Sequence, residues 1–306
     1  MFFATDLHGS DLCFKKFCAA PDFYGATHLI LGGDLTGKLL VPIVQNGRTA
    51  TFHLGGITEE VGLDDLDGQL RRLSNMGYYP VVGDADAAEE LADGARYEER
   101  LTEEALVRAE RWVQYADEKL GGRVQILVAG GNDDDPAVDE VFRDRGVFVN
   151  GEGRVAEIGG LQVASCGWSN PTPWNTPREC SEEELRGRLE TVVSALDDPS
   201  SALFNFHVPP RETALDMCPE LDDELRVVTV MGSPVLQHAG STAVRALIEE
   251  LQPRVSLHGH IHESRGVEEL GRTTAVNAGS EYSEGVLLGA VIDLDGEGAS
   301  VVLTAG

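Results

Sequence analysis

The sequence predicts an α/β fold, and three observations support this class. Short apolar runs typical of strands alternate with segments of helical periodicity along most of the chain. Additional strand-like runs gather toward the C-terminal end, as in mixed α/β folds. The 306 residues are 42% hydrophobic, which is enough to bury a sizeable core. No repeat or low-complexity tract divides the chain, so we expect one domain over residues 1–306.

The first elements follow from apolar runs and capping residues. Residues 2–6 are expected to form a strand, because they are apolar up to Asp6. A helix is expected over residues 10–20, with Ser10 as its N-cap and a proline at position 21 beyond its end. Residues 28–31 are expected to form a second strand, which leads directly into a Gly-Gly-Asp run.

The segment between residues 38 and 120 has the character of an insertion. Residues 39–54 form two β-rich arms around an Asn-Gly pair, which is a strong hairpin signal. A largely helical stretch follows, and its clearest helix begins near Thr102 and stops at the Gly-Gly pair 121–122. We therefore expect 38–120 to be a hairpin and helices without a separate core, serving as a lid or an oligomer contact.

The remaining elements are placed by the same rules. Residues 124–129 form an apolar strand, and Asp135 precedes a proline at the expected start of a helix. Ser181 and Glu184 have the spacing of a capping box. Short strands are expected within 146–165, further strands at 202–206, 227–230, 255–257, 273–277, 286–293 and 299–303, and a helix at 241–251.

The charge balance restricts the class of partner. The chain has 52 acidic and 24 basic residues, a formal net charge of −28. Such a surface repels polyanions, which disfavours nucleic acid and anionic membranes as partners, although a local basic groove stays open. The acidic residues are scattered, as on a surface solvated in high salt; an acidic metal-binding tail is the weaker alternative.

The compartment is expected to be the cytoplasm. No segment is long and apolar enough to span a bilayer, and the first residues are too short for a signal peptide. The five cysteines are odd in number and contain no Cys-x-x-Cys pair. This usage favours reduced core thiols over a disulfide framework.

Side chains that bind metals follow several of the expected strands. Each of these residues alone has an ordinary explanation, since an Asp often closes a turn and a lone His is often structural. Their joint order favours a metal site, because one face of a fold can collect the ends of distant strands. They are suited to two divalent ions, such as Mn, Fe, Zn or Ni, bridged by a carboxylate, for which Asp34 is the candidate. The segments are Asp6-Leu7-His8, Gly33-Asp34, Gly131-Asn132, His207 and Gly259-His260-Ile261-His262.

These motifs resemble the calcineurin-like metallophosphoesterase superfamily, whose pattern runs Asp-x-His, Gly-Asp, Gly-Asn-His-(Asp/Glu), His and Gly-His-x-His. The segment 277–280 resembles the Asn-Pro-Gly-Ser of the same superfamily. Within the superfamily, the segments 167–174 and 207–210 are most similar to predicted phosphoesterases related to the Icc phosphodiesterase group. The resemblance implies a four-layer αββα sandwich of two mixed sheets, here with the hairpin-plus-helix insertion. It also implies two sets of ligands sharing one carboxylate: Asp6, His8, Asp34 and His262 for one ion, and Asp34, Asn132, His207 and His260 for the other.

One position departs from the family pattern. Asp133 stands where the family has a histidine that stabilises the phosphate and protonates the leaving oxygen. Asp133 is anionic at neutral pH unless burial or a neighbouring carboxylate raises its pKa. We therefore expect a preference for phosphodiesters or activated esters over alkyl monoesters. The alternative is that Asp133 caps the following helix or orients Asn132.

Four other residues are candidates for the surroundings of the site, each with a plainer alternative. His238 could replace the missing acid, or be an ordinary loop histidine. Arg178 and Arg211 could contact phosphate, as could Asn132, or the arginines could be solvated surface groups. Trp168 begins a proline-rich loop whose aromatic rings could stack on a substrate or pack the loop down.

The function expected from the resemblance is a metal-dependent phosphoesterase, specifically a phosphodiesterase that uses a hydroxide activated by two metal ions. Asp34, Asn132, Asp133 and His238 are its candidate catalytic residues. The expected partner is a small phosphate ester, and a homo-oligomer is possible. A nuclease of the same fold and a metal-binding scaffold of weak or no activity are the alternatives.

Overall fold

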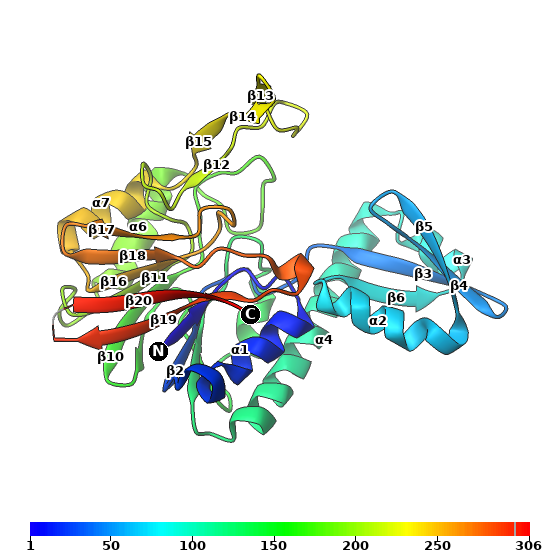
Figure 1. Ribbon diagram of the computed structural model, residues 1–306, viewed down its shortest axis with the longest axis horizontal. Coiled ribbons are helices and arrows are strands. Elements are labelled where there is room, and N and C mark those ends of the chain that lie inside the picture. Colours follow the sequence, from blue (N-terminus) through cyan, green and yellow to red (C-terminus); the bar gives the residue numbers. More distant parts are fainter. Residues whose placement is uncertain (297) are drawn as a thin grey trace.

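The main body contains two six-stranded mixed sheets, as a computed structural model of residues 1–296 and 298–306 shows (Figure 1). Seven α-helices accompany the sheets in the described part of the chain. The first sheet has the order β20 (Gly298–Ala305), β19 (Leu288–Asp295), β1 (Phe2–Ala4), β2 (His28–Leu31), β7 (Gln125–Val128) and β8 (Phe148–Asn150). The second has the order β17 (Gly266–Leu270), β18 (Thr273–Asn277), β16 (Val255–His258), β11 (Leu203–Phe206), β10 (Leu161–Cys166) and β9 (Val155–Ile158).

The central strands of both sheets run parallel. In the first sheet β1, β2, β7 and β8 pair in parallel, and in the second β10, β11, β16 and β18 do so. Only the outer strands β19, β20, β9 and β17 pair antiparallel. Parallel pairing brings the carboxyl ends of neighbouring strands to one edge, where open α/β sheets generally bind ligands.

Both faces of the central parallel strands are buried, so strands such as β1 and β11 are almost continuously apolar. Alternate side chains of β1 illustrate this: Phe2 packs toward the helices, and Phe3 packs against the second sheet. The helices α1 (Asp11–Tyr24) and α4 (Gly94–Leu120) cover the outer face of the first sheet. The helices α6 (Glu182–Val193) and α7 (Thr242–Leu251) pack on the outer face of the second.

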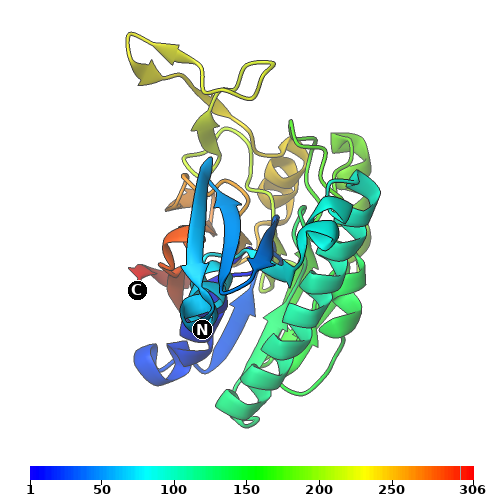
Figure 2. The ribbon, with the colours of Figure 1, turned by 90° about the vertical axis from the view of Figure 1, so that its right-hand side faces the viewer.

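The insertion forms a projection at the right of Figure 1, and Figure 2 views it end-on. It contains a four-stranded sheet of order β5 (Ile57–Gly62), β4 (Thr49–Leu54), β3 (Leu40–Asn46) and β6 (Tyr79–Gly83) with the helices α2 (Leu66–Asn75) and α3 (Ala85–Glu90). The β3–β4 hairpin was expected, and β5 and β6 were not. Ile43, Phe52 and Leu73 bury one side of this sheet, which gives the insertion a small core that we did not expect.

The long helix α4 joins the insertion to the body. Ala105 packs beside Tyr79 of β6, whereas Val113 and Ala116 belong to the core over the first sheet. The helix begins at Gly94, well before the expected start near Thr102, because Asp93 caps its first turn by accepting from the backbone N–H groups of Ala95 and Arg96. Gly121 ends it in the left-handed conformation, as expected.

Other local expectations have mixed outcomes. The Ser181–Glu184 capping box is present, and Ser10 caps α1. Pro21 lies inside α1 rather than beyond it, because the helix continues to Tyr24 before Gly25 caps it.

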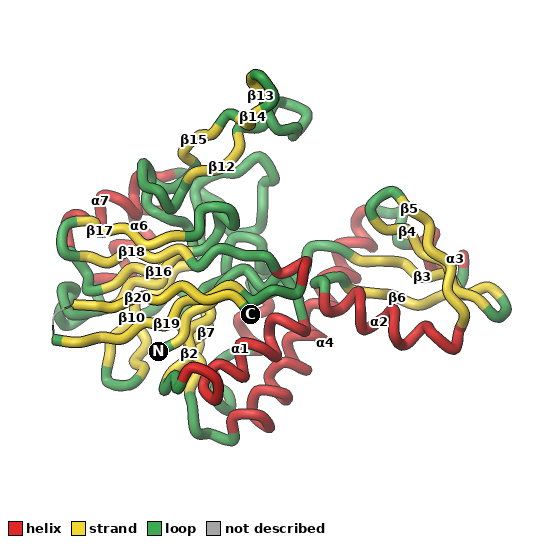
Figure 3. The backbone as a smooth tube through the Cα atoms, viewed as in Figure 1, coloured by secondary structure: helices red, strands yellow, loops and turns green. Residues whose placement is uncertain are grey.

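Figure 3 shows a second projection, an arm with little regular structure. It consists of β12 (Met217–Pro219), β13 (Thr229–Val230), β14 (Ser233–Pro234) and β15 (Leu236–His238), where we expected one strand at 227–230.

Two findings bear on the environment of the protein. None of the described helices combines the length and apolar character that a membrane crossing requires. All five cysteines are free, and Cys13, Cys18 and Cys166 are buried, in agreement with the expected core thiols.

Candidate metal centre

The structure brings the seven predicted metal ligands together at the carboxyl ends of the parallel strands. Asp6 and His8 follow β1, Asp34 follows β2, Asn132 follows β7, His207 follows β11, and His260 and His262 follow β16. Asp6 and His8 are completely buried, and Asp34, Asn132 and His207 are almost so. This convergence is the arrangement expected from the strand ends; the role of these residues as ligands stays a prediction.

One group of side chains surrounds His8 and His262. The Nε2 atoms of these two rings are 3.1 Å apart. Oδ1 of Asp6 is 3.4 Å from Nε2 of His262, and Oδ2 of Asp34 is 3.7 Å from Nε2 of His8. Asp6, His8 and His262 therefore offer ligand atoms close enough together to hold one metal ion.

A second group surrounds His207. Its Nε2 lies 3.4 Å from Oδ1 of Asp34 and 3.1 Å from Oδ1 of Asn132. The same amide oxygen is 2.6 Å from Nδ1 of His260. Asp34 thus directs one carboxylate oxygen to each group, which suits a ligand shared by two ions.

The backbone at four of these residues is in the left-handed region, which non-glycine residues rarely adopt. The φ angles are 53° at Asp6, 41° at His8, 48° at Asp34 and 66° at His260. Each such residue costs about 1–3 kcal/mol, and strain of this kind concentrates at functional sites. Hydrogen bonds from Asp6 N to Gly33 O and from His8 N to Asp34 O hold the strained loops against each other.

Hydrogen bonds behind the ligands fix their orientation. Nδ1 of His207 lies 3.1 Å from the carbonyl oxygen of Gly32, which leaves Nε2 to face the cluster. Ser280 donates its hydroxyl to the carbonyl oxygen of Asp6 at 2.6 Å. Asn277 donates its amide to the carbonyls of Gly259 and Ile261, on either side of His260. The 277–280 segment therefore supports the cluster from β18.

Asp134 connects two of the ligand loops. Its buried carboxylate accepts from the backbone N–H groups of Leu35 and Thr36 after β2 and of Gly131 after β7. Since Leu35 follows Asp34 and Gly131 precedes Asn132, this carboxylate fixes the spacing of two predicted ligands. Sequence reasoning did not assign a role to Asp134.

The electrostatics of the cluster indicate a cation-binding site. Burial acts to lower the pKa of His207, but the charges of Asp34 and Asp6 together with hydrogen bonds to Asp34 and Gly32 raise that pKa to about 10. Burial acts to raise the pKa of Asp6, yet a hydrogen bond with His262 and the charge of His207 hold it well below its usual range. Burial lowers the pKa of His260 to about 4, so this ring is a neutral donor. Divalent cations bind deprotonated ligands, so a cation bound here would release the proton that the carboxylates hold on His207.

Asp133 lies at the edge of the cluster. Its Oδ2 is 3.9 Å from Nδ1 of His8 and forms an ion pair with Lys38. It accepts from the amide of Asn132 at 2.9 Å, so it orients that residue. It does not cap α5 (Ala137–Val141), because Asp135 accepts from the first N–H of that helix. Burial and the charge of Asp34 raise the pKa of Asp133 to about 7.

The other four predicted site residues stand apart. Within the described residues, no side-chain hydrogen bond or ion pair joins them to the metal cluster, although the backbone N–H of Arg178 donates to the carbonyl of Asn132 at 3.1 Å. Arg178 is 2% exposed and donates to the carbonyl of Asp134 and to Asp139, so it supports the β7 loop from beneath. Its contact with phosphate stays a prediction, and the hydrogen bonds of its Nε and Nη2 groups hold the side chain in this supporting position.

Trp168, His238 and Arg211 have neighbours of their own. The guanidinium carbon of Arg188 lies over the ring of Trp168, 3.7 Å from its centre. The ring also packs against the hydrophobic core between the second sheet and the helices α6 and α7, so it does not present a free face. His238 lies on β15 with its Nδ1 2.8 Å from Asp216. Arg211 makes backbone hydrogen bonds with Ser241 and Arg245. Contacts of these residues with a substrate stay predictions.

Two residues beside the cluster were missed by sequence reasoning. Lys38 is one of four lysines in the chain and lies in the same loop as Asp34, a signal that could have drawn notice. The ring of Tyr282, at the start of the 3₁₀ turn η2 (Tyr282–Glu284), is 4.7 Å from the ring of His8. Nothing in its local sequence distinguishes Tyr282 from a surface residue.

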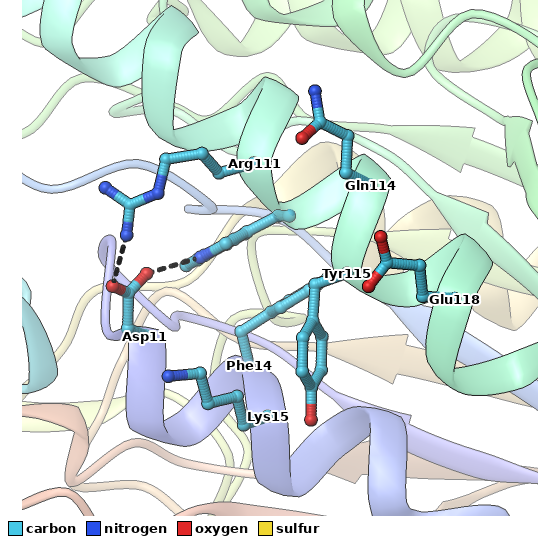
Figure 4. A pocket seen from close by; sticks show the side chains of 8 residues that line it. Asp11, Phe14, Lys15, Arg111, Gln114, Tyr115 and Glu118 are labelled. Carbon is cyan, nitrogen blue, oxygen red and sulfur yellow. Dashed lines mark hydrogen bonds and ion pairs between the residues drawn. The ribbon is translucent and has the colours of Figure 1, made fainter.

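The cavity shown in Figure 4 is a separate feature. It has a volume of about 270 Å³ and lies between α1 and α4. Asp11 at its rim accepts hydrogen bonds from Nε1 of Trp112 at 2.7 Å and from Arg111 at 2.9 Å. None of its lining residues belongs to the metal cluster.

Comparison with known proteins shows a shared fold. No family model matches the chain. The uncharacterized protein MJ1162 of Methanocaldococcus jannaschii is 32% identical over 162 residues, which cover 52% of this chain and 66%, just under two thirds, of that protein. The crystal structure of TT1561 of Thermus thermophilus aligns with a TM-score of 0.53 and 14% identity, covering 98% of this chain and 96% of that one.

Two further solved structures align over nearly the whole chain. One crystal structure gives a TM-score of 0.55 at 16% identity, covering 99% of this chain and 97% of its own. Vacuolar protein sorting 29 of Cryptosporidium parvum covers 100% of this chain and 96% of its own, at 10% identity and a TM-score of 0.25, which is too low to carry an argument. The likeness to TT1561 and to the first of these structures concerns the fold alone.

Proposed function

We propose that this protein is a metal-dependent phosphoesterase of the calcineurin-like metallophosphoesterase superfamily, and that its two-sheet body is the four-layer sandwich of that family. The observation that carries the proposal is the position of Asp34. One of its carboxylate oxygens lies 3.7 Å from His8 and the other lies 3.4 Å from His207. A carboxylate shared in this way by two imidazole-containing groups suits a pair of metal ions.

The side chains divide into two proposed sets of ligands. Asp6, His8 and His262 would hold one divalent ion, and Asn132, His207 and His260 the other, with Asp34 common to both. Imidazole, amide and carboxylate donors fit Mn, Fe, Zn or Ni. When bound, two such ions orient a phosphate ester, neutralise its charge and activate water for attack on phosphorus. The residues of the chain hold this arrangement rigid through the hydrogen bonds of Ser280, Asn277 and Asp134.

The proposed substrates are small phosphodiesters or activated esters. Asp133 occupies the position of the family histidine, so the imidazole that assists departure of a poor leaving group is missing there. The acidic surface, with a formal net charge of −28, disfavours nucleic acid as the substrate. The five free cysteines agree with the reducing cytoplasm that we propose as the compartment.

The test is reconstitution of the purified protein with Mn²⁺, followed by turnover of an aryl diester, an aryl monoester and an alkyl monoester. We expect the aryl diester to be hydrolysed best and Asp34→Asn to lose at least about 100-fold in rate, since both ion positions lose a carboxylate. Asp22→Asn, which changes a half-exposed carboxylate on α1 paired with Lys119, is the matched control.

Four results would contradict parts of the proposal. Metal-dependent activity that survives Asp34→Asn excludes the shared carboxylate. Equal or faster turnover of the alkyl monoester excludes the diester preference. A protein that binds Mn²⁺ but hydrolyses no ester under any condition is the metal-binding scaffold, and cleavage of DNA or RNA that weakens with salt identifies a nuclease.

A further inference from the structure

Lys38 lies where the insertion leaves the body, close to the metal cluster. Its ammonium group forms an ion pair with the carboxylate of Asp133. The Lys38 side chain is 45% exposed, whereas that of Asp133 is 11% exposed. The ammonium group is therefore held at the boundary between the buried cluster and solvent, where a substrate can reach it.

The backbone on both sides of Lys38 is anchored. The N–H of Gly37 donates to the hydroxyl of the buried Tyr79 at 2.8 Å, and the N–H of Leu40 donates to the hydroxyl of Tyr97 at 2.9 Å. A Cβ atom at Gly37 would collide with the carbonyl oxygen of Gly77, so this close approach requires glycine. These contacts come from the insertion, and they place Lys38 without using any predicted metal ligand.

The charge of Lys38 lies beside the cluster. Its partner Asp133 has its Oδ2 3.9 Å from Nδ1 of the proposed ligand His8. In the described part of the chain, Lys38 is the only lysine or arginine ion-paired with a carboxylate of the cluster or its edge. Arg178 lies beneath the β7 loop and pairs with Asp139 instead.

We propose that Lys38 is a substrate-binding residue whose ammonium group contacts a non-bridging oxygen of the substrate phosphate. This inference rests on the proposed phosphoesterase function. An ammonium group is a compact charge with three donors, which suits a phosphoryl oxygen. In the family, a histidine at the position of Asp133 supplies a positive group to the phosphate. In this protein, Lys38 of the insertion would supply that positive group instead. Asp133 then serves to orient the ammonium group.

A structural role for Lys38 makes a different prediction. If Lys38 only neutralises Asp133, its charge is needed only while Asp133 is charged. If Lys38 contacts phosphate, its removal weakens phosphate binding whether or not Asp133 carries a charge. A double-mutant cycle over these two residues therefore separates the two roles.

The experiment is calorimetric titration of inorganic phosphate into the Mn²⁺-loaded full chain. We expect Lys38→Met to weaken phosphate binding roughly 10- to 100-fold, the effect of losing one charge-assisted hydrogen bond. The same loss is expected when Lys38→Met is made in the Asp133→Asn background. Lys38→Arg should retain part of the affinity, and Lys15→Met, which removes an exposed lysine of α1, should retain all of it.

The inference is overturned if Lys38→Met has no effect in the Asp133→Asn background, or if the wild-type protein binds no phosphate. Titration of Mn²⁺ into metal-free Lys38→Met is the second measurement, and we expect no loss of affinity, since neither a proposed ligand nor a residue that accepts a hydrogen bond from one is changed. An inert wild-type enzyme refutes the proposed function, yet the phosphate titration still decides the role of Lys38. In an active enzyme, Lys38→Met should raise KM more than it lowers kcat.

Discussion

The Nε2 atoms of His8 and His262 lie 3.1 Å apart, although 254 positions separate them in the sequence and one follows β1 of the first sheet while the other follows β16 of the second. Two imidazole nitrogens that bind one ion at 2.0–2.1 Å are separated by about 3 Å. The two rings are therefore already spaced as neighbouring ligands of a single ion.

His262→Ala should reduce the number of tightly bound Mn²⁺ ions from two to one. We expect binding at the affected position to weaken by at least about 100-fold, since even residues behind the ligands contribute 10- to 100-fold. Equilibrium dialysis with metal analysis measures the stoichiometry. His53→Ala is the control, because His53 lies on β4 and its Nδ1 contacts Thr58. Two ions bound with wild-type affinity would exclude His262 as a ligand.

Glu152→Gln should change the pH dependence of stability. Burial raises the pKa of Glu152 from its ordinary value of 4.5 to about 7, against the charge of Arg178. Between these pH values the folded protein binds more protons than the unfolded chain, so the free energy of unfolding falls as pH rises, by up to about 3 kcal/mol. In the Glu152→Gln variant, the free energy of unfolding should not fall in this way as pH rises. Urea unfolding at several pH values between 5.5 and 8 measures this dependence. Glu183→Gln, an exposed change on α6, should keep it.

The cysteines should differ in reactivity. Burial raises the pKa of the Cys18 thiol to about 12 and also raises those of Cys13 and Cys166. Since the thiolate is the reactive form, these three should not react with a disulfide reagent at pH 8 until the protein unfolds. At most Cys180 and Cys218, which are partly exposed, should react in the native protein. Three or more rapidly reacting thiols would contradict this assignment.

Arg108→Met should destabilise the junction between insertion and body. Arg108 is 4% exposed and donates to the carbonyls of Gly9 and Tyr78, and its guanidinium lies 4.5 Å from the centre of the Tyr79 ring. Removal leaves buried carbonyl groups unpaired, and we expect a loss of about 3–5 kcal/mol in urea unfolding.

The matched control is Arg111→Met on the same helix, whose side chain is 57% exposed and pairs with Asp11. A partly exposed pair contributes less than about 1 kcal/mol. If both substitutions lower the free energy of unfolding by the same amount, the burial of Arg108 does not give it a larger contribution to stability than Arg111.

The parts of the fold that follow local rules could be predicted from the sequence. Ser10 and Ser181 begin helices because their hydroxyl groups accept from free backbone N–H groups, a rule that needs only neighbouring residues. The convergence of Asp6 and Asp34 could be anticipated because strand ends meet at one edge of a parallel sheet, whereas His207 joins them from the second sheet.

Features that depend on distant contacts could not be predicted. The strand β6 contains Pro80 and pairs in parallel with β3, a partner that no local pattern identifies. It is an edge strand, where proline is tolerated. Arg178 has the sequence context of a surface loop, and its burial follows from contacts with Asp134 in the loop after β7 and with Asp139 of α5. The position of Lys38 depends in the same way on the contact between Gly37 and Gly77.

The place of β1 between β2 and β19 has a consequence for the newly made protein. On the ribosome, β1 emerges long before its neighbour β19 (Leu288–Asp295). One edge of β1 therefore has no partner while the residues between these two strands are synthesised, which exposes it to aggregation. The histidines after β16 also emerge long after Asp6 and His8, so the nascent chain cannot assemble the complete set of proposed ligands until His262 has been synthesised.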